Sequence, residues 1–159
     1  MPQYLVFLLV ALSVIQAPSN YATNKDGKVT LFRQAQQYEA LSFIAHNYLA
    51  GQYFDDLAIG DDILVIYPNT NVTYEVTEFI KYEALDPLNI YSNFRLDKWH
   101  KEKTSTELFL ELFGQRDGRL ILMTCYDGSN GRLYVIAYPK AEEPVNTYKS
   151  ESYIARGVR

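Results

Sequence analysis

Short apolar segments separated by turn-forming residues make up most of the chain. Apolar and polar residues alternate over 73–85, which predicts a long strand. Residues 54–62 indicate a helical turn stopped by glycine, and 107–113 form either a strand or a short helix. Further strands are predicted at 28–32, 63–67, 119–125 and 132–138. Strands at this spacing, divided by turns rich in Gly, Asn and Asp, predict an all-β fold closed into a barrel with short helical turns.

The first residues depart from this pattern. Residues 4–15 are apolar apart from one serine, shorter than the about 20 residues that span a bilayer but of the length found in signal peptides. We expect residues 1–17 to be a signal peptide or membrane anchor, with Ala17 before a cleavage site, although no basic residue precedes Lys25. The alternative is a buried strand or helix. The remaining parts are expected to be a linker, the domain and a polar C-terminal tail, at 18–27, 28–140 and 141–159.

Composition narrows the class of protein. A chain of 159 residues suggests one domain with a hydrophobic core, and its 14 tyrosines favour β-structure. The formal net charge of −4 argues against a nucleic acid as the main partner, because proteins that bind nucleic acids carry a basic patch. The chain has one cysteine, so no disulfide can form within it.

That cysteine, Cys125, ends an apolar segment, and Arg132 follows the turn 126–131. If the two residues are opposite each other in an antiparallel hairpin, their side chains project from the same face about 5 Å apart. The same register makes two further opposed pairs, Met123 with Tyr134 and Ile121 with Ile136. A guanidinium at that range favours the thiolate and can bind an oxyanion beside the sulfur. Lone cysteines more often pack in the core, and a shift of one residue would separate the pair.

A cysteine nucleophile also needs a base or an imidazolium partner. Two histidines are present. His100 lies in the charged segment "LDKWHKEK" and is interpreted as a surface residue. His46 ends the apolar segment "LSFIAH", at a junction of strand and loop like that of Cys125, and is the better candidate.

The order of these residues resembles the sortase family. Sortases carry a Thr-Cys pair at the end of a strand, an Arg opening the next strand and a His far upstream, here Thr124-Cys125, Arg132 and His46. The Gly60-Asp61 pair before a strand is also similar. The resemblance covers roughly 28–140, and "AHNYLAG" with "GRLYVIA" looks closest to a sortase-domain group of Chloroflexi and related bacteria. The chain departs from the family in having Ala where Gly usually precedes the His, and in lacking the first Thr of the common Thr-Leu-x-Thr-Cys segment.

The resemblance implies a closed β-barrel and a cysteine transpeptidase of bacterial surfaces. Cys125 would attack an LPXTG-like sorting signal of a surface protein between its Thr and Gly, forming a thioacyl-enzyme. His46 would serve as general acid and then base for an amine acceptor of the cell envelope. Arg132 would bind the oxyanion or the nearby substrate backbone, and Thr124 would shape the oxyanion site.

The polar segment 86–106 falls where sortases cover the peptide groove. Asn93, Arg95 and Trp99 are therefore candidates for substrate contact, with packing against the barrel an equal alternative for Trp99. No metal or cofactor is expected. The implied location is the extracellular face of the cell membrane, with anchoring through the N-terminal segment, or secretion.

Two other functions are compatible with the residues. The chain could be a non-enzymatic extracellular β-barrel that binds a peptide or glycan, since a fold does not fix a function. It could also be a cysteine peptidase that releases the peptide to water instead of an amine.

Overall fold

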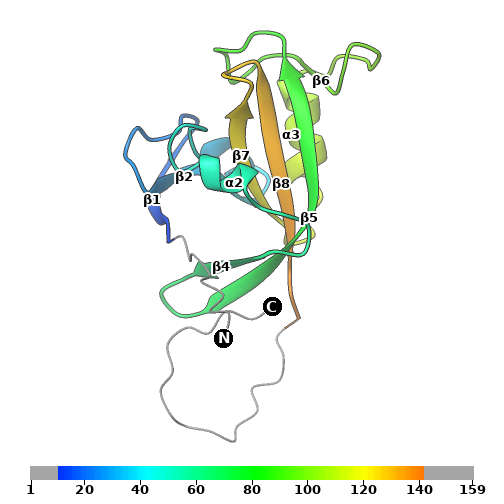
Figure 1. The fold of residues 1–159 in the computed structure, drawn as a ribbon. Helices are drawn as coiled ribbons and strands as arrows, with labels where there is room; N and C mark the ends of the chain where they lie inside the picture. The colour runs from blue at the N-terminus through cyan, green and yellow to red at the C-terminus, as the bar shows by residue number, and fades with distance from the viewer. Residues whose placement is uncertain (1–10, 142–159) are drawn as a thin grey trace, which may run out of the picture.

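Within residues 11–141, which the computed structural model describes, strands outnumber helices (Figure 1). In chain order the elements are β1 (Ser13–Ser19), β2 (Lys28–Phe32), α1 (Arg33–Gln36), β3 (Leu41–Ile44), α2 (Gln52–Asp55), β4 (Asp62–Ile66), β5 (Asn71–Ala84), β6 (Phe94–Arg95), α3 (Ser105–Phe113), β7 (Leu120–Tyr126) and β8 (Gly131–Pro139). The strands predicted at 28–32, 63–67, 73–85, 119–125 and 132–138 are all present, with ends shifted by a few residues.

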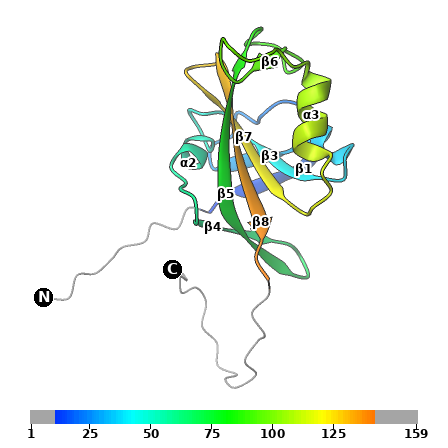
Figure 2. The same cartoon turned by 90° about the vertical axis from the view of Figure 1, so that its right-hand side faces the viewer.

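One sheet contains all these strands, in the order β1-β2-β3-β7-β8-β5-β4, with β6 added beside β5. Helices α2 and α3 lie on opposite sides of this sheet (Figure 2). Successive side chains of a strand point to opposite faces. On β7, Ile121 and Met123 therefore pack in the layer under α3, whereas Leu120 and Leu122 pack in the layer under α2.

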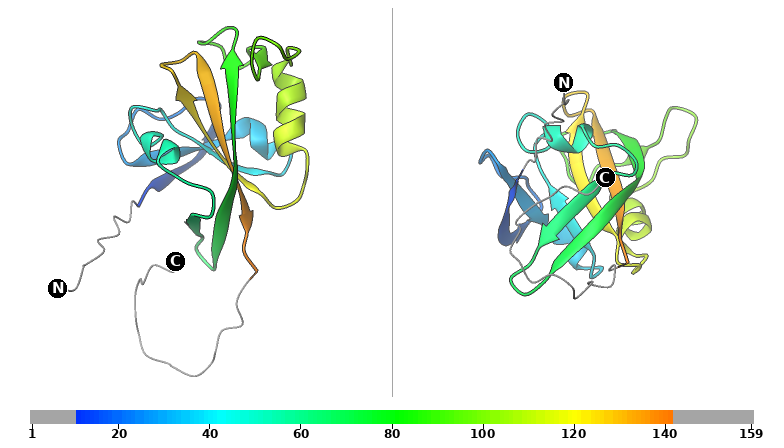
Figure 3. Two further views of the ribbon diagram at one scale, coloured as in Figure 1. Left: turned by 45° about the vertical axis from the view of Figure 1, so that its right-hand side comes forward. Right: turned by 60° about the horizontal axis from the view of Figure 1, so that its bottom comes forward.

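The expected closure into a barrel is wrong. The described strands run from β1 at one edge to β4 at the other, and no hydrogen-bonded pairing joins these edges. Strand β4 pairs only with residues 71–75 of β5, before a register shift between Val76 and Glu78. A bulge of this kind bends a strand. The β4–β5 hairpin accordingly lies below the rest of the sheet and away from β1 (Figure 3), so the fold is an open sheet of mainly β-structure.

The segment 107–113 belongs to helix α3, which resolves the choice between strand and helix. Thr104 and Glu107 form a reciprocal capping box, which satisfies the backbone N–H groups at the helix start. The residues buried by α3 recur three and four positions apart and face the sheet, namely Ser105, Leu108, Phe109, Leu112 and Phe113. Spacing of this kind fits a helix, because a strand would place Leu108 and Phe109 on opposite faces.

Ordered structure begins before the expected domain boundary at residue 28. Strand β1, drawn from the residues expected to be leader and linker, pairs in parallel with β2 from the Ser13–Lys28 pair onward. Its Val14 side chain packs in the α2 layer. The first ten residues and 142–159, which include most of the expected leader and the polar tail, lie outside the described residues. Among the residues that are described, no helix has the length and hydrophobicity needed to span a membrane.

Candidate active site

The β7–β8 hairpin has the register assumed from the sequence. Cys125 is opposite Arg132, Met123 is opposite Tyr134, and Ile121 is opposite Ile136. Directly opposed side chains lie on one face of a sheet. The thiol and the guanidinium therefore leave the sheet on the same side, the side of the α3 layer to which Met123 and Tyr134 belong.

Strand β3 places His46 on the other flank of the cysteine. It runs parallel to β7 in a register that pairs Ile44 with Met123, and the N–H of Ala45 donates to the Met123 carbonyl at 3.2 Å. Strand β3 ends at Ile44, and continuing its register two residues further predicts His46 beside Cys125 on the same face. Because β3, β7 and β8 are neighbours, we expect His46, Cys125 and Arg132 to form a row across three chain segments spaced about 4.8 Å apart.

A tight turn fixes the backbone of His46. Its carbonyl accepts hydrogen bonds from the N–H of Leu49 at 3.0 Å and of Gly51 at 2.9 Å. The imidazole stacks on the ring of Tyr48, with 5.0 Å between ring centroids. His46 and Cys125 are both half-buried, so each side chain keeps access to solvent. Such partial exposure suits groups that must exchange protons and bonds with a substrate.

Arg132 is a buried cation, 8 % exposed. Its Nη1 donates to the carbonyls of Ser129 at 2.8 Å and Gly131 at 3.1 Å, and its Nη2 donates to the carbonyl of Pro87 at 2.7 Å. No carboxylate within residues 11–141 forms an ion pair with it. A buried guanidinium that only carbonyl dipoles stabilise attracts a negative charge that develops nearby.

Thr124 lies on the opposite face from Cys125 and is buried. Its hydroxyl donates to the carbonyl of Ala45 at 2.8 Å, which ties β7 to the residue just before His46. The hydroxyl hydrogen is thus used within the protein. Through this hydrogen bond Thr124 holds the segment that carries His46 against β7. The expected contact of Thr124 with substrate stays a prediction.

Gly51 makes this arrangement possible, and its replacement by alanine should disturb it. A Cβ at position 51 would lie 2.7 Å from the His46 carbonyl oxygen and closer still to the Thr124 hydroxyl, and neither atom belongs to a flexible side chain end. We expect Gly51→Ala to lower the free energy of unfolding by about 1–3 kcal/mol and to shift the NMR signals of the His46 ring. Thermal unfolding and a histidine-selective spectrum measure both; unchanged signals would contradict the assigned turn.

Cys125 lines a hollow of about 350 Å³ on the α2 side of the hairpin. Its other residues include three carboxylates that the sequence analysis did not single out, Asp55 and Asp56 beside α2 and Asp127 in the β7–β8 turn. This hollow lies on the face of Thr124, opposite to the face from which the Cys125 side chain projects, and only the fold assembles it, because Asp55 and Asp127 are 72 positions apart in the chain. No group of side chains suited to a metal ion occurs within the described part of the chain.

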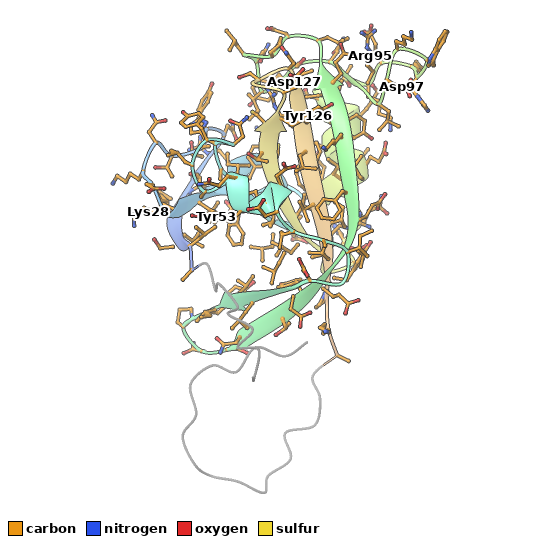
Figure 4. All side chains as sticks on the ribbon, viewed as in Figure 1. Lys28, Tyr53, Arg95, Asp97, Tyr126 and Asp127 are labelled. Atoms are coloured by element: carbon orange, nitrogen blue, oxygen red, sulfur yellow. The ribbon has the colours of Figure 1, made fainter. Side chains whose placement is uncertain are left out.

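A second, larger hollow of about 850 Å³ lies between the β7–β8 turn and the segment after β5. Tyr126 and Asp127 line both hollows, so the two adjoin at these residues. Figure 4 shows Tyr126 and Asp127 at the same end of the molecule as Arg95 and Asp97. The larger hollow is lined by apolar and charged side chains, namely Glu83, Ala84, Leu85, Pro87, Leu96, Asp97, Lys98, Trp99, Tyr126, Asp127 and Asn130.

The candidates in segment 86–106 take different positions. Trp99 is 82 % exposed and lines the larger hollow, so it does not pack against the sheet. Arg95 donates two hydrogen bonds to Glu83, at 2.6 and 3.1 Å, and these bonds, with a smaller contribution from the positive charge, lower the pKa of the Glu83 carboxyl. Asn93 is exposed, and its backbone carbonyl accepts from Leu85 at 2.9 Å. His100 is an exposed partner of Asp97 at 2.9 Å and lies outside the row.

The first part of this segment, residues 86–93, forms a strap over the site. Besides the bond from Arg132 to Pro87, the Tyr91 hydroxyl accepts hydrogen bonds from Gln34 Nε2 at 2.9 Å and Asn20 Nδ2 at 3.2 Å. Ile90 packs in the α3 layer. The strap therefore starts at β5 and reaches residues next to β1 and β2, crossing the face that carries Cys125. Sequence reasoning missed Tyr91, because its partners are 57 and 71 residues away.

Comparisons with known proteins add a likeness in fold. No protein-family model and no curated protein matches the chain. Among solved structures, it is similar to sortase A from Corynebacterium diphtheriae, with 16 % identity and a TM-score of 0.45 over 67 % of this chain and 43 % of that chain. It is also similar to sortase C from Clostridium perfringens SM101, with 15 % identity and a TM-score of 0.45 over 72 % of this chain and 55 % of that chain. A third similar structure is a Clostridium perfringens sortase D5 transpeptidase, with 18 % identity and a TM-score of 0.45 over 72 % of this chain and 63 % of that chain. The chain thus spans about half the length of these proteins, and its activity has to be inferred from its own residues.

Proposed function

We propose that this chain is a sortase-like cysteine transpeptidase. The observation that carries the proposal is the register of β7 and β8, which pairs Cys125 with the buried cation Arg132, while the parallel pairing of β3 with β7 supports a place for His46 on the other flank of the thiol. These are the groups that acyl transfer through a thioester requires. The motif order that resembles sortases supports the same assignment.

In the first half-reaction the Cys125 thiolate attacks the carbonyl carbon of the scissile peptide bond. A carbon–sulfur bond forms while the carbonyl electron pair moves to oxygen, giving an oxyanion. The guanidinium of Arg132 stabilises this charge. When the oxyanion collapses, the carbon–nitrogen bond breaks, and the His46 imidazolium gives its proton to the departing amine. A thioacyl-enzyme and a neutral imidazole remain.

In the second half-reaction an acceptor amine attacks the thioester. Neutral His46 takes the proton that the amine loses, and Cys125 leaves as thiolate, which restores the starting charges. The product is a new amide between the substrate's carbonyl and the acceptor. If water attacks instead, the product is a free carboxylate, and the same residues act as a peptidase.

Substrate has to compete with the strap for Arg132. Both Nη atoms of the guanidinium donate to backbone carbonyls, one of them the Pro87 carbonyl of the strap. A bound peptide is also a row of backbone carbonyls, so it can replace Pro87 with a bond of the same kind. The two hollows adjoin at Tyr126 and Asp127, at the end of the sheet where Cys125 lies, and offer room for parts of a bound peptide.

The finer parts of the proposal rest on the sequence resemblance. They are an LPXTG-like sorting signal cut between Thr and Gly, an amine acceptor of the cell envelope, and a location of the protein at the extracellular face of the cell membrane or, after secretion, outside the cell. Substrate contacts are proposed for Thr124, Asn93, Arg95 and Trp99. A relation to the sortase-domain group of Chloroflexi belongs to the same inference.

Mass spectrometry of the intact chain after incubation with a small library of sorting peptides tests the proposal. We expect an added mass equal to the acyl part of one peptide, located on Cys125, and its loss when an amine such as triglycine is added. A transpeptidase then yields the peptide joined to the amine, whereas a peptidase yields the free acid in the presence of the amine. Binding of peptide without any adduct on Cys125 would contradict the proposal and favour a non-enzymatic binding protein.

A further inference from the structure

Tyr134 is a buried polar residue to which the mechanism above gives no part. Its side chain is 0 % exposed. Its hydroxyl has no hydrogen-bond partner within the described residues. A buried hydroxyl without a partner costs stability, and a phenylalanine of the same shape would remove that cost. A hydroxyl kept under these conditions is a candidate for a role that the resting state does not display.

The register places this hydroxyl close to the row of the active site. Tyr134 follows Arg132 by two residues on β8 and so lies on the same face, opposite Met123. Its ring meets that of Tyr82 edge to face, with 6.1 Å between centroids. The groups whose charges act on its phenol are Arg132, Tyr82 and Cys125. Tyr82 pairs with Arg132 on β5, so this ring contact brings the Tyr134 side chain toward the end of the sheet where Arg132 and Cys125 lie.

Of these three neighbours, only the sulfur can accept the hydrogen bond. Arg132 carries donors alone. The hydroxyl of Tyr82 interacts with Lys103 and Glu111 of the α3 side. Cys125 becomes a strong acceptor when it ionises, because a thiolate carries a full charge. The acceptor that the Tyr134 hydroxyl lacks in the resting state is thus the Cys125 thiolate, which exists only in the reactive form of the site.

Burial also keeps the Tyr134 hydroxyl protonated. Desolvation raises the pKa of Tyr134 well above that of an exposed tyrosine, because burial disfavours the charged phenolate. The hydroxyl of Tyr134 therefore keeps its hydrogen at neutral pH and well above it. It can donate to a thiolate without taking part in proton transfer.

We propose that Tyr134 is a positioning residue that donates a hydrogen bond to the Cys125 thiolate and so favours the reactive form of the nucleophile. This inference deepens the proposed function and rests on it for its biological meaning. The measurable effect on the thiol does not depend on any substrate. The other charged or titratable groups on the face of Cys125 are Arg132 and Tyr82, with Lys103 and Glu111 beyond Tyr82 and with His46 expected on the far flank. Asp55, Asp56 and Asp127 line the hollow on the opposite face, and all these groups are the same in the variant described next.

The test is Tyr134→Phe, read out by the rate at which iodoacetamide alkylates the intact chain between pH 5 and 10. Cys125 is the only cysteine of the chain, so no other thiol contributes. We expect the midpoint of the rate profile to move upward by about one pH unit, because a hydrogen bond to an ionised group is lost. The alkylation rate at pH 7 should then fall up to about tenfold. The midpoint of thermal unfolding should stay the same or rise, because the hydroxyl has no partner in the resting state.

Tyr82→Phe is the matched control, since it removes a hydroxyl from the adjacent buried tyrosine whose partners lie elsewhere. It should leave the alkylation profile unchanged. A Tyr134→Phe profile that coincides with that of the unchanged protein overturns the inference, and so does an equal shift in both variants. If wild-type Cys125 forms no acyl adduct with any peptide while the profile still shifts, the proposed function fails and the hydrogen bond stands.

Discussion

Alanine at position 125 is expected to abolish acyl transfer, with no adduct on the chain and no amide product above background. Cys125 is the only thiol, so no second nucleophile of the same kind can replace it. Removal of a catalytic nucleophile costs about 10⁶-fold in rate in enzymes of this general type. The side chain is half-buried, and stability should change little. Transfer of a labelled sorting peptide to an amine, followed by chromatography, measures the loss.

The two histidines provide the companion experiment. His46→Ala should reduce transfer almost as far, because no group within the row then protonates the departing amine. His100→Ala is the matched control, since that ring is exposed and paired with Asp97 on the strap side of the molecule. Equal losses in both variants would contradict the assignment of His46. Iodoacetamide should still alkylate Cys125 in His46→Ala, which separates a lost proton donor from a lost nucleophile.

Lysine at position 132 is expected to lower kcat/KM by about 10²–10³-fold, the cost typical of losing an oxyanion donor. The guanidinium bonds three carbonyls at once through a planar fork, and a lysine ammonium on a flexible stem cannot reproduce that geometry. Lysine keeps the positive charge at position 132, so the loss in kcat/KM measures the contribution of the planar, forked guanidinium geometry. Steady-state kinetics with a sorting peptide and an amine measure it.

Arg119→Lys is the matched control for this change. Arg119 also forms a forked pair, with Asp117, but it lies at the start of β7, at the other end from Cys125. Its replacement should leave kcat/KM within about twofold of the unchanged enzyme. Arg132→Lys should in addition speed hydrogen exchange of the strap, residues 86–93, because the bond to Pro87 is weakened. Activity retained in Arg132→Lys would remove Arg132 from the mechanism.

Substrate binding at Arg132 requires the strap, residues 86–93, to give up its hydrogen bond with this arginine. Its Pro87 carbonyl occupies Arg132, and Tyr91 fastens its far end to Gln34 and Asn20. The bond from the buried, charged Arg132 to Pro87 is worth about 1.5–3 kcal/mol, and each neutral bond to Tyr91 is worth about 1 kcal/mol. Exchange of these bonds for bonds to a peptide is therefore close to balanced, and the buried apolar contact of Ile90 has to be recovered by the substrate.

Periodicity predicted the elements well wherever one face of a strand was buried. Strands β7 and β8 are buried on both faces, so burial alone does not fix their register, and the length of the turn between them specifies the pairing of Cys125 with Arg132. The helix α3 remained ambiguous with a strand because a segment of seven apolar and acidic residues fits both periods. Its capping box was visible in the sequence at Thr104 and Glu107 and would have settled the choice.

Closure of the sheet was not predictable from the same pattern. Alternation reports which face of a strand is buried but not which edge it pairs with, and the bulge between Val76 and Glu78 turns β4 away from β1. The pattern of residues 13–19 left two alternatives open for a related reason, and the expected leader and linker stay predictions. A short apolar segment suits a leader or a strand equally, and only its pairing with β2 shows the strand.

The sequence by itself determined the chemistry: one thiol, one arginine that hairpin pairing must bring beside it, and an upstream histidine at a strand end. Local pairing across a six-residue turn needs no knowledge of the rest of the chain. The tertiary structure decided what surrounds that chemistry. Parallel pairing of β3 with β7 joins residues about 80 positions apart and brings the segment that carries His46 to the flank of β7, while the pairing of β5 with β8 brings the strap to Arg132. Contacts at such separation depend on how whole strands pack, which no local pattern of residues encodes.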